Sequence, residues 1–193
     1  GPIAEMRRQS TRMTGIIEDL LSLSKLEASD GEAERKPIDM AAMIELLRSD
    51  LVARIDPATT VQGAAQASER LLGDEAQIHS ACANLLDNAA KYTPVGGTIS
   101  MRWWVDGEGG HFSVQDSGIG IGAEHIPRLT ERFYRVDPGR SRATGGSGLG
   151  LAIVKHVLQR HGATLEISSA EGRGSLFSCH FSADRLVSGA TAV

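Results

Sequence analysis

Two glycine-rich turns constrain the path of this chain more than any other feature of its sequence. The first turn, DSGIGI at 116–121, follows a run with strand-like alternation, and the second, GGSGLGL at 145–151, leads directly into an apolar helical pattern. Glycine allows a backbone to approach a ligand closely, and free N–H groups at a helix N-terminus attract anions. We therefore predict a ligand pocket between the two turns, with the intervening residues 122–144 as a mobile lid.

Length and composition exclude several classes of protein. The chain has 193 residues, enough for one domain of ordinary size and an appendage. Its net charge is −4 and it has no basic stripe, so we expect no nucleic-acid partner. The two cysteines, Cys82 and Cys179, have no metal-binding spacing and are interpreted as reduced thiols of a cytosolic protein. No apolar run is long enough to cross a membrane, and the leading Gly1-Pro2 is typical of a cleaved tag, so we expect an excised fragment.

Periodic hydrophobic patterns predict helices and hairpins in a definite order. We expect a helix at 3–29, a polar linker at 30–37, a domain at 38–183 and a disordered tail at 184–193. Within the domain the expected elements are a helix at 39–54, one or two weak strands in 59–72, a helix at 75–92, strands at 98–105 and 111–115, a short helix at 124–132, a helix at 150–161, and a hairpin of 164–168 and 175–181. This order predicts an α/β (α+β) fold, a two-layer α/β sandwich behind an N-terminal helical arm.

The helix at 3–29 carries an apolar stripe that needs a partner. It is either half of a helical hairpin or bundle, or a terminal helix that lies on its own domain, and the periodicity leaves both interpretations open. If the stripe is exposed, we expect concentration-dependent self-association through Ile16, Leu20 and Leu23.

The predicted helix at 75–92 places three polar side chains on one stripe. Asn84, Asn88 and Lys91 are separated by four and three residues, so they lie on the same face. Amide oxygens are hard ligands of the kind Mg²⁺ prefers, and a lysine one turn further suits a phosphate. The alternative is an ordinary solvated face, which the spacing alone does not exclude.

Each glycine turn has two interpretations when taken alone. Asp116 follows a strand and precedes two glycines, so it can accept a hydrogen bond from an exocyclic amine such as that of adenine, although Asp-Ser-Gly is also a common turn. The second turn suits an anion at a helix N-terminus, or is a plain loop-to-helix junction. It matches neither the P-loop nor the dinucleotide GxGxxG pattern.

The segment between the turns is rich in arginine. Arg132, Arg135, Arg140 and Arg142 outnumber the nearby acids, and Phe133 lies among them. Arginine can neutralise the charge that develops on a transferring phosphoryl group. The run can equally be a solvated loop whose Phe133 packs into the core.

Taken together and in this order, four segments resemble the boxes of the ATP-binding domain of bacterial sensor histidine kinases. Residues 84–94 resemble the N box, 116–121 the G1 box, 131–135 the F box and 145–151 the G2 box, and the similarity covers 38–183. Among these kinases, the run 124–156 is most similar to those of the phosphate regulon. The end of the first helix, DLLSLSKLEA, resembles the second helix of the family's dimerisation and phosphoacceptor hairpin.

The resemblance implies a Bergerat-type nucleotide fold, shared with gyrase, Hsp90 and MutL, that binds ATP and Mg²⁺. Asp116 would bind the adenine amine, Asn88 and Asn84 would hold Mg²⁺, and Asn84 would also act in catalysis. Two arginines of the lid, Arg140 and Arg142, would act as catalytic groups at the γ-phosphate. The resemblance assigns further nucleotide contacts to Lys91, Tyr92, Gly118, Gly120, Ile121, Phe133, Gly146, Ser147, Gly148, Leu149 and Gly150.

One departure from the family limits what this chain is expected to do. The family's phosphoacceptor histidine lies in a His-Glu-x-x-x-Pro type motif on the first hairpin helix, and no histidine precedes His79 here. We therefore expect a cytoplasmic fragment that binds Mg·ATP but cannot phosphorylate itself, cut from a protein anchored in the bacterial inner membrane. Its expected partners are the phosphoacceptor helix of the same kinase, a response regulator, and a second copy through residues 3–29.

Two other functions remain open from the sequence. The first is an ATPase of the same fold that is not a kinase, although position 84 lacks the acidic base that hydrolysing members place there. The second is a nucleotide-binding regulatory module, although intact Asn88 and Asp116 argue against a degenerate site.

Overall fold

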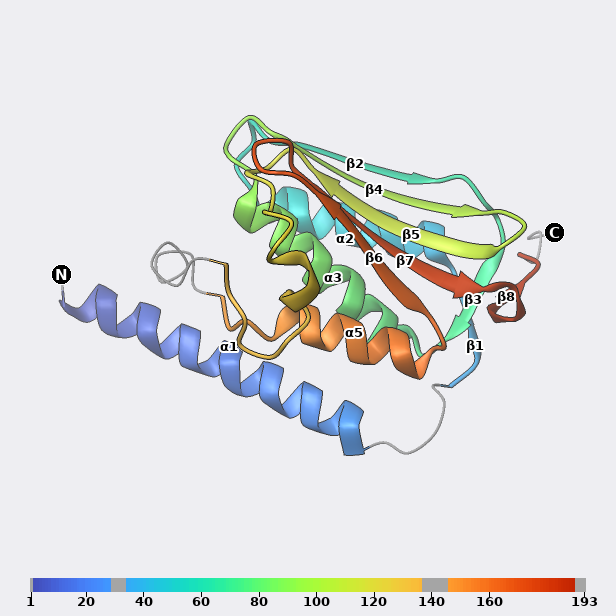
Figure 1. The fold of residues 1–193 in the computed structure, drawn as a ribbon, viewed down its shortest axis with the longest axis horizontal. Helices are drawn as coiled ribbons and strands as arrows, with labels where there is room; N and C mark the ends of the chain where they lie inside the picture. The colour runs from blue at the N-terminus through green and yellow to red at the C-terminus, as the bar shows by residue number, and fades with distance from the viewer. Residues whose placement is uncertain (1, 29–33, 137–145, 190–193) are drawn as a thin grey trace.

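The computed structural model describes residues 2–28, 34–136 and 146–189. A five-stranded sheet is covered on one face by helices, and a long N-terminal helix, α1, lies along the outside of that helical layer (Figure 1). The helices are α1 (Pro2–Ala28), α2 (Met40–Arg54), α3 (Glu75–Tyr92) and α5 (Gly150–Arg160). The expected two-layer α/β sandwich with a helical arm is confirmed.

The large sheet brings the first glycine turn next to the final hairpin. Its strand order is β2-β4-β5-β7-β6, in which β2 runs parallel to β4 and the other neighbours are antiparallel. Asp116, the last residue of β5, is in register with Ile99 on one neighbour and Ser175 on the other. The strands are β2 (Thr60–Ala65), β4 (Thr98–Val105), β5 (Gly109–Asp116), β6 (Thr164–Ser169) and β7 (Ser175–Ser182).

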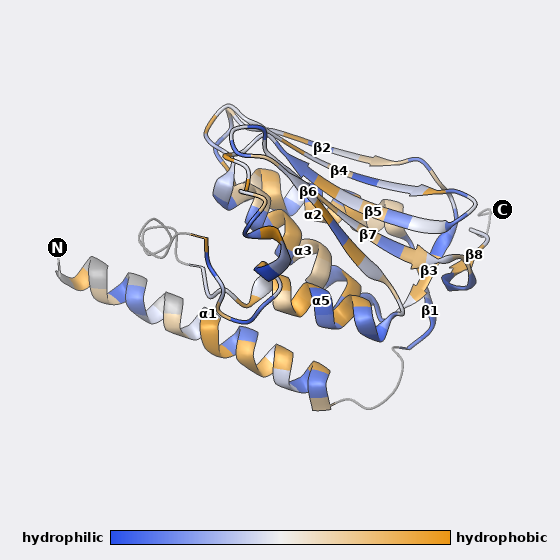
Figure 2. Ribbon diagram, viewed as in Figure 1, coloured by the Kyte–Doolittle hydropathy of each residue, from blue (hydrophilic) through white to orange (hydrophobic). Residues whose placement is uncertain are grey.

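Alternation along the strands explains the core. In β4 the side chains of Ile99, Met101 and Trp103 are buried, because they share the face that the helices cover. Figure 2 shows hydrophobic residues concentrated on α3 and α5, which pack against each other beneath the sheet. Asp39 and Asp74 begin α2 and α3 as N-caps, each accepting a hydrogen bond from a backbone N–H three residues further along.

A second, three-stranded sheet corrects the predictions for the linker and the tail. Its antiparallel order is β1-β3-β8, with β1 (Lys36–Ile38), β3 (Arg70–Gly73) and β8 (Leu186–Val187). The expected linker at 30–37 thus ends in a strand, and the expected disordered tail contains a 3-10 turn, η2 (Ala183–Arg185), followed by a strand. The strands β1 and β8 form because β3 satisfies their backbone hydrogen bonds from either side.

The short helix expected at 124–132 is also corrected. Only one 3-10 turn, η1 (Ile126–Arg128), forms there. The neighbouring backbone hydrogen bonds join residues three apart, including His125 N–H to the Gly122 carbonyl and Glu131 N–H to the Arg128 carbonyl. The segment is therefore a series of tight turns, a geometry that rarely continues for more than a few residues.

Along its C-terminal half, the helical arm lies on its own domain, which was the second of the two interpretations left open by the sequence. Leu23 of α1 is 1% exposed, and α1 contacts α5. Leu23 is therefore covered by its own domain, which corrects its place in the predicted self-association surface. The N-terminal half keeps exposed apolar side chains, among them Ile3, Met6 and Met13. Among the described residues, none of the helices is both long and apolar enough to cross a membrane.

Candidate functional site

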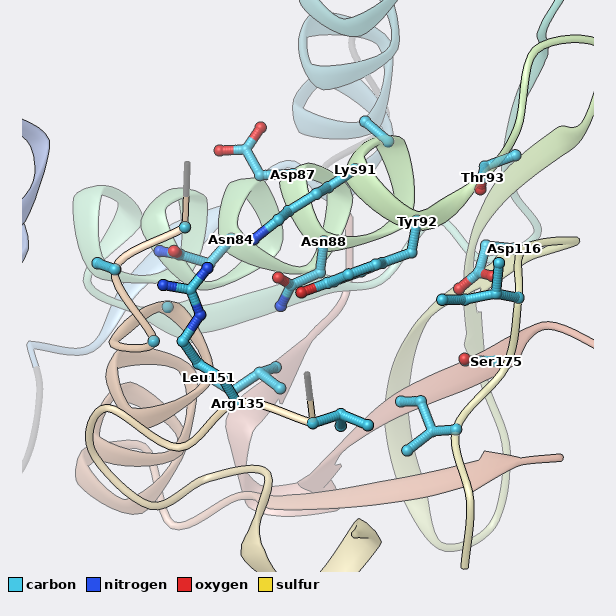
Figure 3. A pocket seen from close by; sticks show the side chains of 18 of the residues that line it. Asn84, Asp87, Asn88, Lys91, Tyr92, Thr93, Asp116, Arg135, Leu151 and Ser175 are labelled. Atoms are coloured by element: carbon cyan, nitrogen blue, oxygen red, sulfur yellow. The ribbon is translucent and has the colours of Figure 1, made fainter. Parts of the chain in front are cut away.

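A cavity of about 2000 Å³ lies between α3, the two glycine turns, the start of α5 and α1. Figure 3 shows its polar side chains separated into two ends. Asp116, Thr93 and Ser175 lie together at one end, called here the Asp116 end. Of the residues predicted from the sequence, those lining the cavity are Asn84, Asn88, Lys91, Tyr92, Asp116, Gly120, Ile121, Gly146, Ser147, Gly148 and Gly150.

The Asp116 end is built around a buried carboxyl group. Asp116 is 7% exposed, and its Oδ1 accepts a hydrogen bond of 2.8 Å from the Gly118 N–H. Burial raises the pKa of Asp116, although hydrogen bonds from the backbone N–H groups of Gly118 and Ser175 oppose that shift. Gly118 does not line the cavity; its N–H holds the Asp116 carboxyl group in place. The arrangement suits a ligand that donates a hydrogen bond to a shielded carboxylate.

The final hairpin holds the first glycine turn against Asp116. Gly120 has φ +69°, and a Cβ there would collide with the carbonyl oxygen of Ala170, so no other residue fits without a backbone shift. The Ser169 hydroxyl accepts the Ile121 N–H at 2.9 Å and donates to the Gly174 carbonyl at 2.8 Å. The sequence analysis missed this support, because no local pattern pairs residues fifty positions apart.

The other end of the cavity, called here the Lys91 end, is formed by Asn84, Lys91 and Arg135 (Figure 3). The Asn84 amide nitrogen donates to the Ser80 carbonyl at 2.9 Å, which leaves its Oδ1 facing the start of α5. A Cβ on Gly150 would come within 2.7 Å of that oxygen. Asn84 therefore meets the second glycine turn closely, and Asn88 lies between the two ends.

The predicted polar stripe of α3 and the second glycine turn are thus in contact. Lys91 Nζ lies against Gly146, where a side chain would displace it. It also lies 5.0 Å from the centre of the Tyr92 ring. The turn precedes α5, whose N-cap, Leu149, makes no side-chain hydrogen bond. Cations, amide oxygens and the N-terminus of a helix therefore converge, which suits a multiply charged anion.

Several predicted residues do not line the cavity. Leu149 is fully buried in the core, and Phe133 is 57% exposed, so Phe133 neither lines the cavity nor packs into the core. Phe133 instead supports the second glycine turn through its backbone, because its N–H donates to the Gly148 carbonyl at 2.9 Å. The φ of Phe133 is +62°. Arg140 and Arg142 lie outside the described residues.

Arg135 is the functional candidate that the sequence analysis did not select. Its side chain enters the Lys91 end of the cavity (Figure 3). The sequence places it in the arginine-rich run, but composition cannot tell which arginine of a run points inward. Its neighbour Tyr134 also lines the cavity, with its hydroxyl 2.7 Å from His125 Nδ1 and its ring beneath Arg128.

The candidate metal ligands on the polar stripe of α3 are the amide oxygens of Asn84 and Asn88, and the carboxylates of Asp19 and Asp87 also line the cavity among the described residues. No group of three or more His, Cys, Asp or Glu side chains among them can hold a metal ion. Asn84 Oδ1 is free of intrahelical bonds and faces the turn, and Asn88 is one helical turn away. Two neutral oxygens suit a hard cation that keeps most of its ligands from water and phosphate.

Comparison with known proteins gives a consistent result. Residues 73–185 match the family described as histidine kinase-, DNA gyrase B-, and HSP90-like ATPase. The chain is 50% identical over 188 residues to the phosphate regulon sensor protein PhoR of Pseudomonas aeruginosa, covering 93% of this chain and 41% of that protein. It is 37% identical to the sensor-like histidine kinase SenX3 of Mycolicibacterium smegmatis, covering 90% and 45%. The chain thus spans less than half the length of these curated relatives.

Solved structures have the same fold. The mycobacterial sensor histidine kinase MprB superposes with a TM-score of 0.67 at 29% identity, covering 77% of this chain and 97% of that one. Full-length ShkA superposes with a TM-score of 0.80 at 23% identity, covering 98% of this chain and 39% of that one. The second match includes the region of the helical arm.

Proposed function

The chain belongs to the family of histidine kinase-, DNA gyrase B- and HSP90-like ATPases, and from this membership we propose that it is the ATP-binding catalytic domain of a two-component sensor histidine kinase. The observation that carries the proposal is the two-ended cavity. A shielded carboxylate at the Asp116 end and a cation-rich helix N-terminus at the Lys91 end match the two chemically different halves of ATP. The 50% identity to a phosphate regulon sensor supports a role in phosphate regulation.

Asp116 is proposed to select adenine. Its carboxylate is 7% exposed and accepts the exocyclic amine of the base, a hydrogen bond that gains strength from exclusion of water. The side chains of Ile119, Ile121 and Phe177 also line the cavity and offer apolar contact to the flat ring. Guanine carries a carbonyl oxygen at the corresponding position, so it would face Asp116 with acceptor against acceptor.

The Lys91 end is proposed to hold the phosphates. Lys91, Arg135 and the N–H groups at the start of α5 bring positive charge and donors to one place. Asn84 and Asn88 would hold Mg²⁺ through their amide oxygens, and the ion would supply charge neutralisation on the phosphates. Because phosphoryl transfer needs little covalent work from the protein, these residues act by positioning ATP and neutralising its charge.

The phosphoryl acceptor is proposed to be a histidine outside these residues. No histidine precedes His79, and none of the described residues lining the cavity is a histidine. The acceptor would come from the dimerisation helix of the same kinase, and the phosphoryl group would pass on to an aspartate of a response regulator. The complete protein is proposed to be anchored in the inner membrane through a segment outside this chain.

Incubation with γ-labelled ATP tests the proposal. The chain alone should stay unlabelled, whereas a separate polypeptide that carries the phosphoacceptor helix should gain an acid-labile label in its presence. Label on the chain alone would contradict the proposed acceptor. Rapid release of free phosphate without any acceptor would instead favour a non-kinase ATPase of the same family, and absence of ATP binding would favour a regulatory module.

A further inference from the structure

The arm makes a direct contact with the second glycine turn. The Ser147 hydroxyl donates to Oδ2 of Asp19 on α1 at 2.6 Å, and the Ser147 oxygen accepts the Leu149 N–H at 3.1 Å. Asp19 and Ser147 both line the cavity. A residue 128 positions away in the chain therefore holds a hydroxyl group of the turn where the phosphates are proposed to bind.

This contact is one part of a longer attachment of α1 to the domain. Leu23, one turn after Asp19, is buried at 1% exposure. Glu27 forms an ion pair with Arg132, and its carboxylate lies 3.4 Å from Nε2 of His156. These contacts add to the one at Ser147 in holding α1 on the domain, so Asp19 is presented to the turn by the arm as a whole.

The chemistry of a serine hydroxyl makes the contact exclusive. A hydroxyl has one proton to donate, and that of Ser147 is given to Asp19. It cannot donate to a phosphate oxygen at the same time. The Asp19 carboxylate also lines the cavity that is proposed to receive the phosphates, and like charges repel each other.

We propose that Asp19 and the phosphates of ATP compete for the Ser147 hydroxyl, so that attachment of α1 and phosphate binding oppose each other. Asp19 is then a positioning residue that acts on nucleotide affinity through Ser147. The inference rests on the proposed nucleotide function. Because coupling between two binding events is reciprocal, ATP should loosen α1 by the same factor by which α1 weakens ATP binding.

Calorimetric titration with ATP and with adenosine tests the competition. Asp19→Ala should bind ATP about three- to tenfold more tightly, the effect of one hydrogen bond in a coupled equilibrium, and should leave adenosine affinity unchanged. Glu18→Ala removes the same charge from an exposed neighbour on α1 and should leave both affinities unchanged. In a Ser147→Ala background, Asp19→Ala should gain less than it gains in the wild type.

Hydrogen exchange gives the reciprocal measurement. Amides of α1 should exchange faster when the wild type is saturated with ATP, and not when it is saturated with adenosine. Unchanged or weaker ATP binding by Asp19→Ala, or equal tightening for ATP and adenosine, would overturn the competition while the wild type still binds ATP. Failure of the wild type to bind either ligand would instead overturn the proposed function.

Discussion

The two ends of the cavity are built in different ways. The Asp116 end is built mainly on neighbouring strands of one sheet and on the final hairpin, with Thr93 at the end of α3 beside them, and Gly120 packs there too closely for a side chain. The Lys91 end is assembled from α3, α5, the loop carrying Arg135 and the separate helix α1. A site made within one sheet is held rigidly, whereas a site made between elements changes when one of them moves. Base recognition is therefore expected to be constant, and phosphate binding adjustable.

The largest loss of nucleotide affinity should come from substituting Asp116 at the rigid end of the cavity. Asp116→Asn replaces one acceptor oxygen by a donor in a buried site, so affinity should fall about 100-fold or more for both ATP and adenosine. Arg135→Ala should weaken ATP alone, because adenosine has no phosphate to contact. Calorimetric titration measures both.

Matched variants distinguish lost recognition from lost folding. Glu108→Gln changes an exposed acid in the turn between β4 and β5 and should leave both affinities unchanged. The thermal midpoint of Asp116→Asn should stay close to that of the wild type. If Asp116→Asn lost ATP binding but still bound adenosine, the adenine base would have to lie elsewhere in the cavity.

The next effect concerns the packing that makes the Asp116 end rigid. Gly120 and Gly172 have nearly the same backbone, with φ +69° and +74°, but of the two only at Gly120 would an added Cβ meet another chain segment. Gly172→Ala should cost about 1 kcal/mol in unfolding free energy, the cost of a left-handed backbone. Gly120→Ala should cost more by about 2 kcal/mol, because it adds a steric collision with the Ala170 carbonyl.

Urea unfolding monitored by circular dichroism compares these two alanine variants directly. Each shares the same left-handed strain, so their difference isolates the steric contribution. Equal free energies of unfolding would mean that the hairpin moves freely away from the first glycine turn, and the Asp116 end would then be as adjustable as the Lys91 end.

The smallest effect concerns His161, which joins the end of α5 to the start of α3 at a point away from the cavity. Its Nε2 accepts the Asp74 N–H at 3.1 Å, and its Nδ1 lies 2.8 Å from the Val157 carbonyl, so the neutral form with a proton on Nδ1 satisfies both. Burial lowers the pKa of His161 below 6.5, so the unfolded chain binds a proton more readily. Neutral His161 therefore contributes to the free energy of unfolding; the contribution is complete above pH 6.5 and is lost as the pH falls through the lower folded-state pKa.

Urea unfolding between pH 7.5 and 5 checks that linkage. His161→Gln has no titrating group, so its unfolding free energy should fall less than that of the wild type over this range. Adenosine affinity at pH 7.5 should be unchanged in the variant, because the Asp116 end does not depend on this junction. Parallel pH curves for the two proteins would show that His161 contributes nothing to the linkage.

Local patterns predicted the elements and the parts of the site that lie on single elements. Spacing placed Asn84, Asn88 and Lys91 on one helical face, and strand alternation placed Asp116 at the end of a strand, because both depend on residues close in sequence. The tail was missed because Leu186 becomes a strand only by pairing with Leu71. No periodicity within ten residues encodes that pairing.

The sequence by itself determined which residues are available for chemistry and which elements carry them. The tertiary structure decided which of them meet. It brought Arg135 into the cavity while Phe133 was left exposed, and it set Asp19 against Ser147 across the length of the chain. The physical reason is that helix and strand formation follow near neighbours, whereas a cavity depends on packing and hydrogen bonds between segments that local propensity does not relate.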